Sequence, residues 1–514
     1  MRRRVLCLMV LSCVLTVWPA FAELQNVEVG GEIRLRGNYI SDCLTAAPQV
    51  RWPGALLVGR PIGGAGNNVL SAWDWDGGNT PDMKFVEHRT RLHVKADFTD
   101  SVCAFVELDS YDWWGQDFRS NYVTGVDRAA VSNDDVEVFQ SYVEANEMWG
   151  QPLRLRLGRQ ELAFGSQWLV GTGDFAFFFT GLSFDAVRLT YAGEDFTVDA
   201  WASKLAELSP LEQDGDTDFY GVYGSYTGVE NLTLDAYWMY VRDAAGLNDT
   251  AGMDWIENLL GVDDYDATQL HTVGLRGAGV IGGFDYNAEV SYQFGEAAQQ
   301  GFLFKPAVYG DDDADFDTFG GTVEVGYSFD YTCKPRLFAG VIYLDGEDNR
   351  DISFLEWLNP FDSPKASVSF NRLFSNQIYS GFFDLTNDLS NAWIGRVGAL
   401  ASPVEKLRVL LMVSYFEAVD EFDAPWTLDV GPWRIPTPFS FWTEENDASL
   451  GVETDLFVWY QYSEDLTFEL GWAHLFADDG LTDGQYSRFN GLLFTGGTDD
   501  EDADYVYAGA VLKF

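Results

Sequence analysis

The sequence predicts an all-β fold: a transmembrane antiparallel β-barrel of about 18 strands, with long extracellular loops and short periplasmic turns. Three observations lead to this prediction. Apolar and polar residues alternate with a period of two in segments of about ten residues, which is typical of strands that face lipid on one side and water on the other. The connections between these segments are alternately long and short. Residues 23–514 contain no run of about 18 apolar residues, so we expect no membrane-spanning helix.

The N-terminus has the pattern of a secretory signal peptide. Arginines at positions 2–4 precede an apolar run at 5–18, and positions 20–22 form a small-x-small cleavage site. We therefore expect a signal peptide at 1–22 and the β-barrel at 23–514. Removal of the signal peptide would lower the formal net charge from −48 to −51, because it takes away three arginines and no acidic residue.

The composition excludes several classes of protein. The 80 Asp and Glu residues outnumber the 32 Lys and Arg residues, and so acidic a chain would repel a phosphate backbone, so we expect no nucleic acid as a partner. The 38 Phe, 24 Tyr and 18 Trp argue against a disordered chain. Cys43, Cys103 and Cys333 are far apart, so we expect neither a disulfide framework nor a zinc site.

The strands are assigned from the period-two pattern, which segment 283–294 illustrates. Its even positions from 284 to 294 are apolar or aromatic and its odd positions from 285 to 293 are polar, so one side suits lipid and the other the interior. In chain order, segments of this kind predict strands at 25–40, 85–97, 102–111, 137–147, 153–161, 183–192, 195–204, 217–227, 231–242, 269–278, 283–294, 319–329, 335–345, 389–400, 405–417, 447–460, 465–476 and 502–514.

Nine long and eight short connections join these strands, and they alternate strictly along the chain. Acidic clusters fall in the long connections, where charge remains in water. Closely spaced carboxylates could converge on a calcium ion, but no cluster has the full spacing of a known calcium loop, so we expect solvated loops. The clusters lie at 311–313 with Asp315 and Asp317, at 263–264, at 347–348 and at 499–504.

The chain ends on an aromatic residue, Phe514, with apolar residues at 506, 508, 510 and 512. This ending resembles the C-terminal signal that the bacterial barrel-assembly machinery reads. The alternative is the closing strand of a soluble β-sandwich, which gives no reason for the alternation of loop lengths. We therefore expect the bacterial outer membrane as the location, and its lipid, its lipopolysaccharide and the barrel-assembly machinery as partners.

A barrel of about 18 strands leaves an aqueous lumen, so function is read from the inner face. Strand parity assigns this face, because residues that alternate with lipid-facing ones point inward. In the first strand, Ile33 and Leu35 face lipid and the arginines beside them face inward. Leu92, Leu155 and Val187 fix the parity of three later strands in the same way. Parity places these arginines on the inner face: Arg34, Arg36, Arg89, Arg91, Arg154, Arg156, Arg188, Arg276 and Arg396.

This arginine pattern has two interpretations. Arginines in a pore favour anions and bind carboxylates in bidentate fashion. Alternatively, inward-facing Glu107, Asp109 and Glu144 brace the arginines through cross-strand ion pairs. The two interpretations are compatible. Later strands are acidic on the inner face, so anion selectivity does not follow from the arginines alone; these acids are Glu289, Glu324, Glu453, Asp455 and Glu469.

Several motifs resemble the alginate-export family of outer-membrane barrels. The resemblance implies a channel of about 18 strands whose electropositive constriction passes a polyuronate chain outward, with loops that act as plugs. The motifs are Glu87-His88-Arg89-Thr90-Arg91-Leu92, Phe105-Val106-Glu107-Leu108, Leu157-Gly158-Arg159-Gln160-Glu161-Leu162, then Gly165 and Leu169-Val170-Gly171, and finally Ser183-Phe184-Asp185-Ala186-Val187-Arg188-Leu189.

The resemblance implies that Arg89, Arg91, Arg154, Arg156, Arg159 and Arg188 form the charged wall. Strict alternation aims Arg159 at lipid, and we expect a bulge or a strand end near Gly158 to turn it inward. Where the family pattern leads us to expect an arginine, this chain has Leu182, preceded by an aromatic stretch at 175–180. The missing arginine and the added aromatic residues argue against alginate itself as the substrate, but they do not affect the prediction of a barrel.

Aromatic residues fit the same architecture. Six of them lie near predicted strand ends with outward parity, as an interfacial girdle requires. Trp201, Phe457 and Trp459 have inward parity, so they are candidates either for stacking on sugar rings or for structural packing. The girdle residues are Trp238, Tyr240, Tyr292, Trp393, Tyr460 and Trp472.

The expected function is an outer-membrane channel that passes an anionic polysaccharide or small anions, with that polysaccharide and periplasmic export proteins as further partners. A general diffusion porin with weak selectivity is the first alternative. A barrel enzyme or adhesin is the second, but the four histidines, at 88, 93, 271 and 474, lie in no nucleophile motif, so we expect no catalysis. No fingerprint predicts a cofactor or metal.

Overall fold

In the computed structural model, 18 strands of the described chain form one antiparallel sheet. The described residues are 24–41, 82–99, 101–115, 136–173, 179, 181–207, 216–244, 267–296, 315–346, 369–384, 389–421, 424–425, 427–430, 433–436, 443–444, 447–482 and 502–514.

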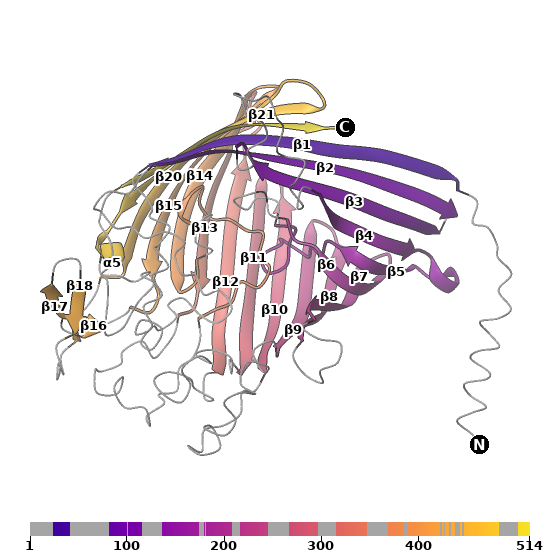
Figure 1. The fold of residues 1–514 in the computed structure, drawn as a ribbon, viewed down its shortest axis with the longest axis horizontal. Coiled ribbons are helices and arrows are strands. Elements are labelled where there is room, and N and C mark those ends of the chain that lie inside the picture. Colours follow the sequence, from indigo (N-terminus) through magenta and orange to yellow (C-terminus); the bar gives the residue numbers. More distant parts are fainter. Residues whose placement is uncertain are drawn as a thin grey trace, which may run out of the picture.

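The strands follow one another around the ring in chain order (Figure 1). The first nine are β1 (Asn26–Ser41), β2 (Met83–Thr99), β3 (Val102–Trp113), β4 (Glu137–Ala145), β5 (Leu153–Gln160), β6 (Phe184–Ala192), β7 (Phe196–Ala206), β8 (Thr217–Val229) and β9 (Leu232–Asp243). The other nine are β10 (Thr268–Ile281), β11 (Phe284–Glu296), β12 (Asp315–Ser328), β13 (Arg336–Leu344), β14 (Ala392–Val404), β15 (Leu407–Ala418), β20 (Ser449–Gln461), β21 (Leu466–Ala477) and β22 (Ala503–Lys513).

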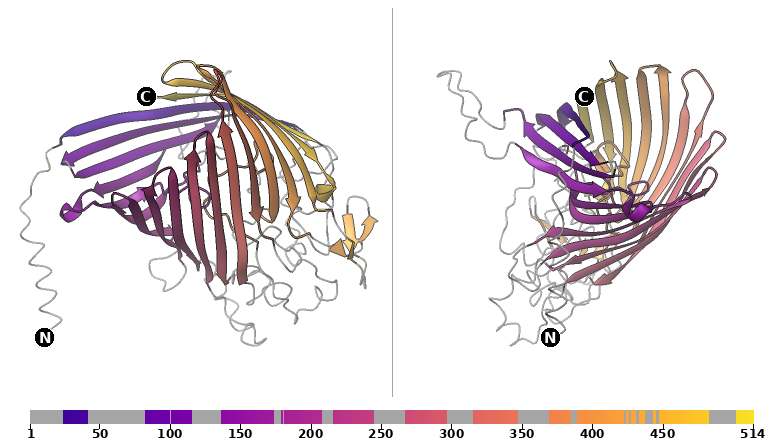
Figure 2. Two further views of the ribbon diagram at one scale, coloured as in Figure 1. Left: turned by 180° about the vertical axis from the view of Figure 1, so that it is seen from behind. Right: turned by 90° about the vertical axis from the view of Figure 1, so that its right-hand side faces the viewer.

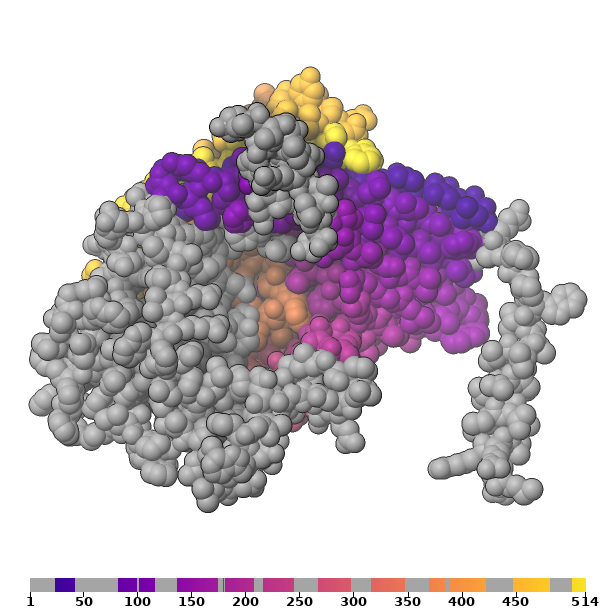
Figure 3. Space-filling model, in the orientation of Figure 1, coloured from indigo at the N-terminus to yellow at the C-terminus, as the bar shows by residue number. Residues whose placement is uncertain are grey.

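The barrel is closed by pairing between its first and last strands. Ile33 of β1 lies opposite Thr90 of β2 on one side and opposite Leu512 of β22 on the other. The backbone N–H of Gly31 donates to the carbonyl of Phe514 at 2.8 Å, which extends this ladder to the C-terminal residue. Figure 3 shows the indigo atoms of β1 beside the yellow atoms of β22, and Figure 2 shows the ring from behind and from the side. Closure leaves no open sheet edge, as a membrane barrel requires.

The structure confirms the predicted fold class and each of the 18 predicted barrel strands. Strand ends differ by a few residues. β14 begins at Ala392 rather than at 389, because the Ser390 hydroxyl donates to the carbonyl of Phe370 and Asn391 has a left-handed φ of 49°. The strand can therefore begin only after this turn. β12 begins at Asp315 rather than at 319, since its acidic start still pairs with the end of β11.

The remaining short elements lie in the connections. They are η3 (Met148–Gly150), α5 (Asp479–Thr482), and two small ladders that pair β16 (Ala424–Pro425) with β19 (Thr443–Glu444) and β17 (Thr427–Val430) with β18 (Trp433–Pro436). Among the described residues, no helix has the length and apolar character needed to cross a membrane.

The outer face of the barrel is apolar. Leu275, Val290 and Val323 lie on neighbouring strands and are at least half exposed, which would be unfavourable in water but suits lipid. Near the strand ends, aromatic side chains of neighbouring strands stack on one another in rows. Tyr240 and Phe294, for example, both stack on His271, at centroid distances of 4.3 and 5.1 Å. These contacts fit the predicted interfacial girdle.

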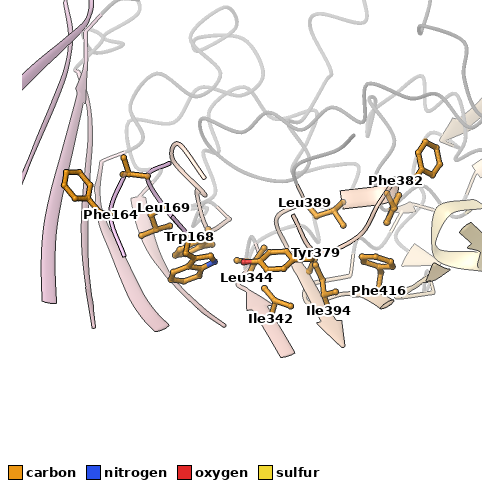
Figure 4. Packing of buried hydrophobic residues seen from close by; sticks show 14 of the residues in the cluster. Phe164, Trp168, Leu169, Ile342, Leu344, Tyr379, Phe382, Leu389, Ile394 and Phe416 are labelled. Carbon is orange, nitrogen blue, oxygen red and sulfur yellow. The ribbon is translucent and has the colours of Figure 1, made fainter. Parts of the chain in front are cut away.

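Two internal segments fill part of the barrel. Residues 161–173 follow β5, and residues 369–384 with 389–391 precede β14. Val170 and Phe374 form a parallel bridge, and Trp168 stacks on Phe370 at 5.6 Å, so the two segments pack on each other. Figure 4 shows how their apolar side chains line up against β13, β14 and β15. The main hydrophobic core therefore lies inside the barrel, between these segments and the wall.

Several sequence predictions fall outside the described residues. These are the signal peptide at 1–22 and the acidic clusters at 263–264, 311–313, 347–348 and 499–501. Asp315 and Asp317 of one cluster belong to β12, and Asp317 accepts a hydrogen bond from Tyr292 at 2.5 Å.

Candidate functional site

The first group of predicted arginines lies where β1 and β2 pair. Arg34 and Arg89 are opposite each other in the register. Each arginine has a carboxylate partner, on the neighbouring strand or two strands away: Arg89 with Glu32 at 2.6 Å and Arg34 with Glu469 at 3.7 Å. Arg36 binds Glu87 at 2.6 Å in the same row. Side chains of one face thus bring three positive charges together, because β1 alternates and β2 pairs with it in register.

A phenylalanine lies among these three arginines. The ring of Phe179 is 4.4 Å from the Arg34 guanidinium, 4.5 Å from that of Arg36 and 5.7 Å from that of Arg89. The Arg89 guanidinium also donates to the Phe179 carbonyl at 3.0 Å. Phe179 belongs to the aromatic stretch noted in the sequence, and nearby Leu182 packs on the internal core. An aromatic ring against this cation cluster gains cation–π attraction.

Arg91 continues the row on β2. It binds Asp109 of β3 at 2.9 Å, and its guanidinium lies 3.8 Å from the ring centre of Phe139. Glu107, which the sequence offered as another brace, accepts instead from Gln140 at 2.7 Å. Gln140 lies directly opposite Glu107 in the pairing of β3 with β4.

The second group lies on β5 and β6. Arg156 pairs with Glu144 at 2.6 Å, and Arg188 pairs with Asp199 at 2.8 Å. Arg154 differs, because it contacts the Thr190 hydroxyl at 3.4 Å and has no carboxylate within 4.0 Å in the described chain. Its charge is therefore the least compensated of the predicted set.

The last two arginines lie on the opposite part of the ring. Arg276 of β10 binds Asp235 at 2.6 Å, with Glu289 at 3.8 Å. Arg396 of β14 binds Glu324 at 2.5 Å. They are separate from the β1–β6 arginines and sit among the acids that the sequence placed on the later strands.

Arg159 requires a correction. Its side chain is 44% exposed and forms a two-pronged ion pair with Asp185, at 2.8 and 2.9 Å, whereas the next residue, Gln160, is fully buried. Gly158 has a φ of +125°, but β4 and β5 keep their register beside it, so no bulge reverses the alternation. Arg159 therefore lies on the outer face and not with the inner arginines.

The sequence reasoning missed the attachment of the 369–391 segment to the wall. Glu453 accepts from the backbone N–H groups of Phe382 and Phe383, both at 2.7 Å, and Asp455 accepts from that of Gly381 at 3.0 Å. Both carboxylates are fully buried. Inward parity identified these acids, but nothing local in sequence links them to residues 70 or more positions away.

Two further charged residues were missed. Arg336 of β13 binds Asp285 at 2.5 Å and Glu324 at 2.8 Å, and parity would have found it. Arg372 lies inside the internal segment and binds Asp384 at 2.6 Å. Beside it, burial raises the pKa of Tyr379, so this phenol stays neutral. No strand periodicity surrounds Arg372, so no pattern in the sequence predicts its burial.

Taken together, the inner face carries positive charge that is mostly matched by nearby acids. Nine of the ten predicted arginines lie on it and one lies outside. The described residues contain no group of three or more His, Cys, Asp or Glu side chains arranged to hold a metal ion. The site is therefore a charged, aromatic-lined interior rather than a cluster of reactive groups.

A closed antiparallel barrel with an apolar outer face and a charged interior is the architecture of a bacterial outer-membrane channel. A family model described as alginate export matches residues 71–492, so the chain belongs to the alginate export family. The protein is thus a transport channel of the bacterial outer membrane. No curated protein sequence matches the chain significantly.

Solved porin structures are similar in fold at low sequence identity. Pseudomonas aeruginosa OccK8 (OprE) is 12% identical, with 95% of this chain and 98% of that chain covered and a TM-score of 0.46. Acinetobacter baumannii OccAB4 is 10% identical, with 96% and 100% covered and a TM-score of 0.49. The anion-selective porin from Comamonas acidovorans is 10% identical, with 95% and 99% covered and a TM-score of 0.40.

Proposed function

We propose that the channel passes an anionic polysaccharide, an alginate-like polyuronate, or small anions by diffusion along the arginines of its inner wall. The observation that carries the proposal is the gathering of arginines on the inner side of β1, β2, β5 and β6, in a chain with 80 acidic and only 32 basic residues. Basic residues are scarce in this chain, yet several of its arginines lie on the inner wall, where a solute would pass.

Ion pairing does not exclude this role. A uronate carboxylate offers an arginine the same bidentate partner as an Asp or Glu side chain. A uronate carboxylate of the solute can therefore replace the Asp or Glu partner of each arginine in turn. The displaced Asp or Glu competes for the same arginine, so the solute is not bound too tightly. Conduction requires binding that is favourable but weak.

A general diffusion porin with weak selectivity is the second candidate. It is supported by the ion pairs themselves, since Arg36, Arg91 and Arg188 each lie within 2.9 Å of a carboxylate and contribute little net field at a distance. The two candidates differ in whether a polyuronate interacts with the arginines.

The test is block of single-channel current by oligomannuronate in a planar bilayer. The proposal expects concentration-dependent block that is largely lost when Arg154, Arg156 and Arg188 are changed together to Ser. Arg159→Ser is the matched control, because it removes an arginine from the outer face. Block of equal strength in the triple variant, or no block in the wild-type channel, would favour the general porin. A folded-barrel assay on each variant separates loss of binding from loss of assembly.

We further propose that outer-membrane lipopolysaccharide surrounds the apolar face, that the barrel-assembly machinery inserts the chain through its C-terminal strand, and that periplasmic export proteins deliver a polysaccharide. The C-terminal pairing of Phe514 with Gly31 supports the second point. Deletion of Phe514 should lower the amount of folded protein in the outer membrane, with little effect on total synthesis. Unchanged insertion would contradict it.

A further inference from the structure

The inner face of β7, β8 and β9 carries three aromatic side chains apart from the arginine cluster on β1 and β2. They are Trp201, Tyr223 and Tyr237, one from each strand, and all are buried. Tyr223 and Tyr237 stack with a centroid distance of 5.4 Å and an interplanar angle of 6°. Three neighbouring strands thus present aromatic rings toward the interior, and the planes of the two tyrosine rings are nearly parallel.

Glycines allow these rings to lie flat against the wall. A Cβ on Gly221 would lie 2.1 Å from Cζ2 of Trp201, and a Cβ on Gly274 would lie 2.3 Å from Cζ of Tyr237. Any other residue at these two positions would push the ring away from the strand. The wall is therefore shaped to hold rings with their faces toward the lumen.

One residue of the internal segment 161–173 covers this surface. The Phe164 ring stacks on Trp201 at 4.5 Å and on Tyr223 at 5.2 Å, with interplanar angles of 19° in both cases. Two residues further on, the Ser166 hydroxyl donates to Glu289 at 2.6 Å. The tip of the segment offers the wall one flat ring and one hydroxyl, the two features that a pyranose ring would offer.

Polar groups surround the rings. The hydroxyl of Tyr223 donates to Asp235 at 2.8 Å, and Arg276 binds the same Asp235 oxygen at 2.6 Å. Two buried atoms here, the indole nitrogen of Trp201 and the other carboxylate oxygen of Asp235, have no hydrogen-bond partner in the described chain. Buried polar atoms are normally satisfied, so the Trp201 nitrogen is suited to donate, and the Asp235 oxygen to accept, a hydrogen bond from a ligand.

We propose that Trp201, Tyr223 and Tyr237 form a saccharide-binding platform for one pyranose ring, and that Phe164 occupies this platform when no saccharide is bound. The apolar face of a pyranose would stack on the rings, while its hydroxyls would reach Asp235, Arg276 and the Trp201 indole nitrogen. The inference rests on the proposed passage of a polysaccharide, and adds a site that recognises the sugar ring rather than its charge.

Because Phe164 competes with the sugar, removing its ring strengthens sugar binding. Phe164→Ala should lower the concentration of a neutral hexasaccharide, mannohexaose, that half-blocks the channel by about tenfold, the effect of about 1.4 kcal/mol of lost competition. Phe374→Ala is the matched control. It removes an aromatic ring from the other internal segment. In the described chain that ring contacts the rings of Phe184 and Phe219, and no ring contact joins it to Trp201, Tyr223 or Tyr237.

The measurement is current block by mannohexaose in planar bilayers, with oligomannuronate in parallel. The proposal is overturned if Phe164→Ala leaves the block constant unchanged, or if Phe374→Ala strengthens block equally, since both would then only widen the pore. In the Phe164→Ala background, Trp201→Leu should cancel the gain; a persistent gain would also overturn the proposal. Block by mannohexaose without block by oligomannuronate would contradict the arginine proposal and leave the platform intact.

Discussion

At the scale of single residues, Arg154 differs from the other inner arginines in its partner. It contacts a neutral hydroxyl, that of Thr190 at 3.4 Å, whereas Arg156 on the same strand binds a carboxylate at 2.6 Å. The field of an ion pair falls off quickly with distance, but an uncompensated charge acts over the pore. The charge of Arg154 should therefore influence permeating ions more than that of a paired arginine.

We predict that Arg154→Ser lowers the ratio of anion to cation permeability by about twofold, because it removes the least compensated inner charge. Reversal potentials in a salt gradient measure this ratio. Arg159→Ser makes the same change on the outer face, where Asp185 pairs with the arginine, and should leave the ratio unchanged. Equal effects of the two substitutions would show that position inside the barrel is irrelevant.

A second residue-scale prediction concerns Glu453. Glu453→Ala leaves the backbone N–H groups of Phe382 and Phe383 without their acceptor, at a cost of about 1–3 kcal/mol for each buried donor. The internal segment should loosen, so amide hydrogen exchange at 381–384 should accelerate and the open conductance should rise. Glu469→Ala is the control, since its carboxylate pairs with Arg34 and does not contact this segment. Unchanged exchange after Glu453→Ala would mean that other contacts hold the segment.

At the scale of strands, the wall of β7–β9 depends on where glycine lies. Gly221 and Gly224 are both on β8, yet a Cβ at the first would meet Trp201 at 2.1 Å and at the second would meet only the Ala236 carbonyl at 3.7 Å. The same strand therefore offers one position that tolerates a side chain and one that does not.

Gly221→Ala should destabilise the barrel by about 1–3 kcal/mol, because the Trp201 ring must leave its position. The temperature at which the folded band disappears on a detergent gel reports the change. Gly224→Ala should leave this temperature close to that of the wild type. A loss of stability in Gly224→Ala, or none in Gly221→Ala, would contradict the placement of Trp201.

The strands could be predicted from sequence because apolar and polar residues alternate within each of them. This alternation identifies the lipid-facing and inward-facing sides of a strand without information from distant residues. Inner arginines followed from the same period, and so did two of their braces, Asp109 and Glu144. Glu107 does not brace an arginine, because it lies opposite Gln140 of β4 and accepts a hydrogen bond from that side chain. The inward placement of Arg159 is wrong, because this residue follows the strict alternation of β5 and lies on the outer face.

The resemblance implied loops that act as plugs, but the residues that fill the barrel could not be predicted, because their structure depends on contacts distant in sequence. The N–H of Gly171 donates to the carbonyl of Phe374 at 2.9 Å, and Asn376 bonds Gln167 at 2.9 Å across 209 positions. No local period marks such residues. The covering of the aromatic platform is also a contact between residues distant in sequence, because Phe164 of the internal segment stacks on Trp201.

At the scale of the whole molecule, a closed barrel separates two environments for charge. The outer face exposes apolar side chains to lipid. The inner face holds arginines on β1, β2, β5 and β6 and acids on β11, β12, β20 and β21, and one of these acids, Glu469 of β21, pairs with Arg34 of β1. Ions that cross the pore respond to the combined electric field of these charges. Dissolved salt screens this field, and the screening length falls from about 10 Å at 0.1 M salt to about 3 Å at 1 M.

Ion selectivity should therefore weaken as the salt concentration rises. We predict that the ratio of anion to cation permeability moves toward one between 0.1 M and 1 M KCl, with the same direction of selectivity throughout. Reversal potentials at matched concentration ratios measure it. A ratio that does not change with salt would point to discrimination by pore size instead of charge.

The most direct test of the central claim is the reversal potential of the wild-type channel in a planar bilayer under a KCl gradient at low salt. If arginines of the inner wall govern passage, the potential takes the sign of chloride selectivity, and oligomannuronate reduces the current. A potential of the sign for potassium selectivity, without block by the oligomer, would mean that the acidic partners cancel the arginines, and the protein would then be a general porin.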